Sequence, residues 1–156
     1  MDYVIKGILP DRIALAMMLD AATTGSYKAN PFNFHNFGLN YIALSSNSQM
    51  IARIPLEPNF ACHDYLREYL TVMEAMGYDT GPYTWAISPT QWATGHNIWV
   101  FKVTPGPIGG LHSKQLNGDI RLEMKFSNPL AANVTLLLLS EEPATLEIDQ
   151  FNHVLI

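Results

Sequence analysis

The sequence predicts an all-β fold with roughly eight or nine strands and one helix. Most of its regular segments either alternate apolar and polar residues with a period of two or are short apolar runs, and turn-forming residues bound them. Only one segment has the period of a helix. Strands and helices do not alternate along the chain and no internal repeat is visible, which disfavours α/β and solenoid folds.

The clearest strands lie between Gly118 and Glu141. Apolar and charged residues alternate strictly from Ile120 to Phe126, which predicts a strand with one buried face. After a turn at Ser127–Pro129, the run Val134–Leu139 is apolar on both faces, which predicts a strand covered from two sides. We expect these two strands to form an antiparallel pair.

Strands and one loop are predicted for the first third of the chain. Ile5–Leu9 and Ile13–Leu19 are short strands separated by a Pro-Asp turn, although good helix formers in the second segment also allow a helix. Residues 21–34 have loop composition. Phe37–Leu44 is a long strand and Met50–Ile54 a short one.

The predicted helix follows a Pro-rich stop at residues 55–58. Its apolar residues recur at spacings of three and four and should pack on the core: Leu66, Tyr69, Leu70, Met73 and Met76. Asp64 is placed to cap its start and Gly77 to end it in a left-handed conformation.

The remainder should be loops and strands. Residues 78–95 form a long loop with two tryptophans, and His96–Val103 is a strand. A second loop, at residues 104–114, precedes the strand pair, and short strands are expected at Ala144–Asp149 and His153–Ile156.

The length and composition of the chain predict a single folded domain over residues 1–156. Hydrophobic residues make up 48% of the chain and charged residues 15%. The net charge is −5 and the nine basic residues are scattered, so we expect no direct binding of nucleic acid. A single cysteine, Cys62, precludes an internal disulfide, and no secretory signal or membrane span is visible. We expect a soluble protein of the cell interior, nuclear or cytoplasmic.

No residue pattern predicts an enzyme, a metal or a cofactor. Asp79-Thr80-Gly81 matches the catalytic triplet of aspartic proteases, which act as a carboxylate pair, but a solvated turn is the favoured interpretation. The Gly- and Lys-containing loop Gly106–Lys114 has the wrong order for a phosphate loop. Cys62 and His63 are adjacent in sequence, so their side chains should diverge rather than form a nucleophile and its base. The five histidines lack metal-ligand spacing.

Several segments, in order, resemble the hexon-like major capsid protein of Polinton or Maverick elements and adintoviruses, a family that includes capsid-derived genes in animal genomes. The matching segments are Pro10–Met17, Gly25–Leu44 with its NPFNF element, Ile54–Phe60 with LEPNF, Asp64–Glu74, Gly118–Leu139 and Leu146–Leu155.

The resemblance implies a jelly roll, a β-sandwich of about eight antiparallel strands with one short helix in a loop. Family proteins carry two jelly rolls in tandem and assemble as trimers, and this chain is similar to the C-terminal one. It implies a non-enzymatic structural protein of the virion, or a fragment or host-retained descendant, whose partner is itself or a related capsid subunit.

Two sets of residues are candidates for contacts. Four aromatics in the long loop could offer stacking surfaces: Tyr78, Tyr83, Trp85 and Trp92. Such surfaces would make the chain a jelly-roll module that binds carbohydrate or peptide. We favour the interpretation that these aromatics anchor the loop to the sheet. Leu137 and Leu139 would form a patch for a partner if they face outward. Ile156 should tuck against the body or a neighbouring subunit.

Overall fold

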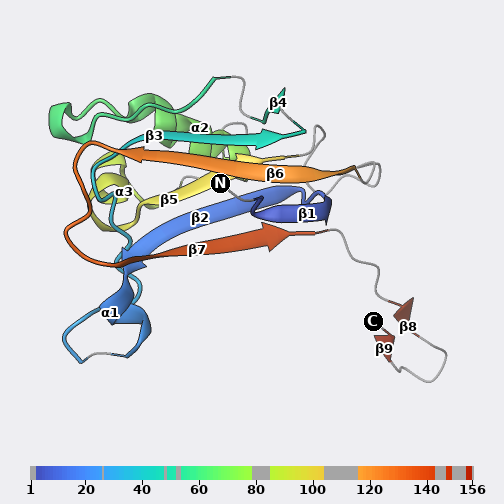
Figure 1. Ribbon diagram of the computed structural model, residues 1–156, viewed down its shortest axis with the longest axis horizontal. Coiled ribbons are helices and arrows are strands. Elements are labelled where there is room, and N and C mark those ends of the chain that lie inside the picture. The colour runs from blue at the N-terminus through green and yellow to red at the C-terminus, as the bar shows by residue number, and fades with distance from the viewer. Residues whose placement is uncertain are drawn as a thin grey trace.

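The computed structural model consists mainly of two antiparallel sheets, consistent with an all-β sandwich (Figure 1). It describes residues 3–25, 27–47, 49–51, 54–78, 85–103, 116–142, 147–148 and 154–155. The first sheet has the order β1-β6-β3-β4, formed by Ile5–Ile8, Asn117–Phe126, Leu39–Ser46 and Gln49–Met50. The second has the order β5-β2-β7, formed by Ile98–Lys102, Arg12–Leu19 and Val134–Glu141. The predicted all-β class is confirmed.

Two short strands near the C-terminus pair with each other. β8 (Glu147–Ile148) and β9 (Val154–Leu155) form a small antiparallel unit. They lie inside the two segments expected to be strands there.

The helical segments are more numerous than the sequence predicts. They are α1 (Asp20–Thr23), a 3-10 turn η1 (Phe60–Cys62), α2 (Leu66–Met76) and α3 (Pro89–Gly95). α2 packs against β5 and touches α3, so these two helices extend the core beside the β5 edge of the second sheet (Figure 1).

β2 is a strand, and the helical alternative for this segment is wrong. It pairs with β5 on one side and with β7 on the other, from Arg12 opposite Glu141 to Leu19 opposite Val134. Ile13, Leu15 and Met17 are buried in the core. Ala16 and Met18, on the opposite face, are buried as well, and cover on both faces explains why the sequence of β2 is apolar throughout.

β6 has the two faces that its alternation predicts. Ile120 and Leu122 are buried, whereas Arg121 and Lys125 are exposed. The Nζ of Lys125 lies 3.4 Å from the carboxylate of Glu123 and 4.1 Å from the ring centroid of Tyr41 on β3. The outer face of this sheet is therefore a charged, solvated surface.

The predicted antiparallel pairing of β6 with β7 is wrong. β6 pairs with β1 and β3 in the first sheet, and β7 pairs with β2 in the second. The connection at residues 127–133 therefore carries the chain from one sheet to the other (Figure 1). Alternation fixes which face of a strand is buried but not which strand lies beside it.

α2 (Leu66–Met76) ends at the predicted residue. Gly77 adopts the left-handed conformation, with φ of 79°, and its N–H donates to the carbonyls of Glu74 and Met73. Only glycine adopts this conformation without steric cost, which explains why the helix stops there.

The start and the buried face of α2 differ from the prediction. Its N-cap is Tyr65 without a side-chain hydrogen bond, because the backbone of Asp64 instead forms a β-bridge with Asn59. Tyr69, Val72 and Ala75 are buried, whereas Leu66 and Leu70, expected in the core, are exposed.

Candidate functional site

α3 occupies part of the segment expected to be a loop, and a capping box begins it. The Ser88 hydroxyl oxygen accepts a hydrogen bond from the N–H of Gln91 (3.3 Å), and the Ser88 N–H donates to Oε1 of Gln91 (2.9 Å). Pro89 sits in the first turn, where it loses no helical hydrogen bond. This Ser-Pro-x-Gln pattern is readable in the sequence and could have predicted the helix.

Trp92 lies at the centre of the aromatic core. Its side chain is fully buried, and its Nε1 donates to the carbonyl of Ile98 at 2.8 Å. Its ring meets that of Trp99 edge to face at 5.0 Å, and the rings of Tyr69 and Phe60 lie about an ångström farther away, at 6.1 Å. Trp92 therefore anchors α3 to β5, and its ring faces are covered by the protein.

Trp85 and Tyr78 are less deeply buried. Trp85 is half-buried and stacks on Tyr69 at 5.5 Å, with the two rings only 12° from parallel. The Tyr69 hydroxyl donates to the carbonyl of Ile87 at 2.7 Å, which holds the segment before α3. Tyr78 follows the end of α2 and is 36% exposed. Tyr83 and Asp79 lie outside the described residues.

Of these aromatics, Trp92 therefore offers no surface on which a carbohydrate or peptide could stack. Trp92 has no accessible face, and one face of Trp85 is stacked on Tyr69. A ligand that stacks on aromatic rings requires at least one exposed ring face.

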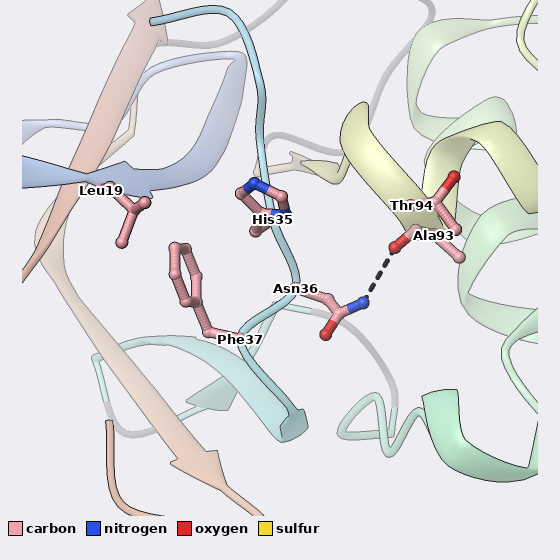
Figure 2. A pocket seen from close by; sticks show the side chains of 6 residues that line it. All are labelled: Leu19, His35, Asn36, Phe37, Ala93 and Thr94. Carbon is pink, nitrogen blue, oxygen red and sulfur yellow. Dashed lines mark hydrogen bonds between the residues drawn. The ribbon is translucent and has the colours of Figure 1, made fainter. Parts of the chain in front are cut away.

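A surface hollow of about 440 Å³ lies between the end of β2 and α3 (Figure 2). It is lined by Leu19, His35, Asn36, Phe37, Ala93 and Thr94.

The polar side chains that line this hollow form contacts within the protein. Asn36 donates from Nδ2 to the carbonyl of Ala93 (2.8 Å), as Figure 2 shows, and its Oδ1 accepts from the N–H of Gly38 (2.8 Å). The Thr94 hydroxyl donates to the carbonyl of Thr90, on the previous turn of α3. The His35 ring packs edge-on to Phe37 at 5.6 Å. The bond from Asn36 tethers the segment before β3 to α3, and these contacts join no acid, base and nucleophile.

In the described part of the chain no three His, Cys, Asp or Glu side chains gather as a metal site. Cys62 is an exposed free thiol, and His63 next to it has a left-handed backbone.

β7 does not have the two-sided cover that its composition predicts. It lies at the edge of its sheet, and Leu136, Leu137 and Leu139 are 40%, 48% and 68% exposed. Of the two alternatives for Leu137 and Leu139, the outward-facing patch is the one observed. Ile156 lies outside the described residues.

One end of β7 is clamped to β2 by an ion pair. Nε and Nη2 of Arg12 lie 2.6 and 2.9 Å from the two carboxylate oxygens of Glu141, a bidentate arrangement. The hydrogen bond from Arg12 holds the pKa of Glu141 below its ordinary value. The carboxylate of Glu141 is therefore paired with a cation of its own chain.

The helices of the described residues are all too short or too polar to cross a lipid bilayer.

Comparison with known proteins gives one distant relative. The chain is 24% identical over 126 residues to an uncharacterized protein of Caenorhabditis elegans, with 78% of this chain covered. It spans only 30% of the length of that relative. No protein-family model and no solved structure matches the chain.

Proposed function

We propose that this chain is a structural, capsid-type domain that acts by associating with itself or with a related subunit. The proposal rests first on the resemblance to hexon-like capsid proteins, which includes strands of both sheets and α2. In this proposal the two sheets form a jelly roll equivalent to the C-terminal half of a tandem pair, and the chain acts in a virion or in the cell interior.

The observation that carries the proposal is the exposed leucine strand at the edge of the second sheet. Leu137 and Leu139 are among the exposed large hydrophobic residues and lie side by side on one face of β7. The first sheet, in contrast, turns charged residues outward along β6. Exposed apolar edge strands tend to pair with strands of other chains, and monomeric proteins usually have features that prevent this pairing.

Light scattering and electron microscopy of the purified protein test this function. We expect particles larger than one chain at high concentration, and ordered assemblies when a related jelly-roll subunit is added. A protein that stays monomeric at every concentration, and forms no assembly with that subunit, would contradict the proposal.

The reading frames beside the gene give an independent test. A neighbouring frame for the other jelly roll, a packaging ATPase or a maturation protease is expected if the gene belongs to a capsid-forming element.

A further inference from the structure

We propose that two copies of this chain associate through β7, which pairs edge to edge with its counterpart as an antiparallel strand about a two-fold axis. This inference rests on the proposed function and names the contact by which it operates. β7 ends the order β5-β2-β7, and among the described residues no strand lies on its other side.

The backbone of β7 offers a row of hydrogen-bonding groups on that open side. The carbonyls of Asn133 and Glu141 accept bonds from the β2 side, from the N–H groups of Asp20 (3.0 Å) and Asp11 (2.8 Å). Successive residues of a strand alternate in direction, so the intervening odd-numbered residues also face β2. The N–H and C=O groups of the even-numbered residues then point to the open edge: Val134, Leu136, Leu138 and Ser140.

The exposed side chains of β7 favour a strand as the partner. The register places Leu136 on the same face as buried Met17, and Leu137 on the opposite face, beside Ala16. Both leucines are nonetheless at least 40% exposed. A partner lying on one face of the sheet would cover only one of them, whereas an adjacent strand flanks side chains on both faces.

The edge also lacks the features that usually prevent pairing. β7 pairs with β2 in an unbroken register of eight residues, without a bulge that would twist the edge away. From Val134 to Ser140 it contains no proline and no charged residue.

A second copy of β7 fits this edge because the strand is complementary to itself. The partner strand must be apolar on both faces, and β2, which is also apolar on both, already has neighbours on both edges. A two-fold axis perpendicular to the sheet keeps the faces matched when one residue lies opposite its own counterpart, and the two strands overlap most when that residue is Leu137 or Leu138. Both registers place leucine opposite leucine, and they form about six to eight backbone hydrogen bonds.

The charges permit this pairing. Antiparallel strands carry the Glu141 side chains of the two copies to opposite ends of the contact, and each carboxylate is already bound to its own Arg12. No like charges oppose each other along the strand pair.

Lysine substitutions test the contact. The double variant Leu137→Lys/Leu139→Lys brings lysines opposite each other in either register, and both sites are exposed enough to accept lysine in the folded monomer. The matched control is Leu66→Lys/Leu70→Lys, two leucines on α2 that are 55% and 53% exposed. Sedimentation velocity should show at least about tenfold weaker association of the β7 variant, with far-UV circular dichroism unchanged, and unaltered association of the control.

Hydrogen exchange read by NMR locates the contact directly. Raising the concentration of the wild-type protein should slow exchange at the amides of Leu136 and Leu138, and the β7 variant should lack this protection.

The outcomes separate this inference from the proposed function. Equal association of the wild type and the β7 variant would overturn the β7 contact while leaving self-association intact. Protection of Leu136 and Leu138 only after a related subunit is added would also overturn it, because the occupant would then be that subunit. A wild type that is monomeric alone and with that subunit would overturn both.

Discussion

Replacing Trp92 by phenylalanine should destabilise the fold strongly, because its indole is fully buried between α3 and β5. The phenyl ring cannot donate to the Ile98 carbonyl, now bonded at 2.8 Å, and an unsatisfied buried carbonyl costs about 1–3 kcal/mol. The smaller ring also leaves a cavity beside Trp99, worth about 1 kcal/mol. The expected loss in the free energy of unfolding is therefore about 2–4 kcal/mol.

Urea unfolding followed by far-UV circular dichroism measures this loss. With a denaturant slope of about 2 kcal/mol/M, the midpoint should fall by about 1–2 M. Trp85→Phe is the control, because a phenyl ring at this half-buried site can still stack on Tyr69, and its cost should stay below about 1 kcal/mol. Equal midpoints for the Trp92→Phe and Trp85→Phe variants would refute the assignment of Trp92 to the core.

Three further changes test local features by the same unfolding assay. Gly77→Ala should cost about 1 kcal/mol because the residue has φ of 79°; an unchanged midpoint would contradict the left-handed end of α2. Ser88→Ala removes the capping box shared with Gln91 and should cost about 1 kcal/mol, whereas a neutral result would argue against α3. Glu141→Gln should cost about 0.5 kcal/mol at neutral pH, because the pair with Arg12 is partly exposed. Folding lowers the pKa of Glu141, so the ion pair stabilises the fold fully at a pH above the ordinary carboxyl pKa. The difference in unfolding free energy between wild type and variant should vanish as the pH falls through the lowered pKa of Glu141. A difference that does not depend on pH would contradict the pairing.

Most strand positions could be predicted from local pattern, whereas strand partners could not, and the expected strand Met50–Ile54 overlaps β4 only at Met50. The alternation from Ile120 to Phe126 correctly gave the buried and solvated faces of β6. The short turn after Phe126 suggested a hairpin, but residues 127–133 cross to the other sheet, so the actual neighbours of β6 and β7 are distant in sequence.

Burial was predicted correctly for the alternating strand β6 but not for β7 or for part of α2. The apolar run of β7 suggested a covered strand, yet β7 is an edge strand with exposed leucines, and its composition does not distinguish it from a central strand. Leu66 and Leu70 on α2 were expected to pack, but the helix turns Tyr69 and Val72 to the core instead. The burial of Trp92 could not be predicted because it depends on α3, whose capping signal at Ser88 was missed.

The molar mass of the purified protein as a function of concentration tests self-association most directly. Sedimentation equilibrium should give a mass that rises from the 17.4 kDa of one chain towards a multiple of it as concentration increases. A mass that stays at one chain up to the highest soluble concentration, and also when a related jelly-roll subunit is present, would contradict a structural role based on association.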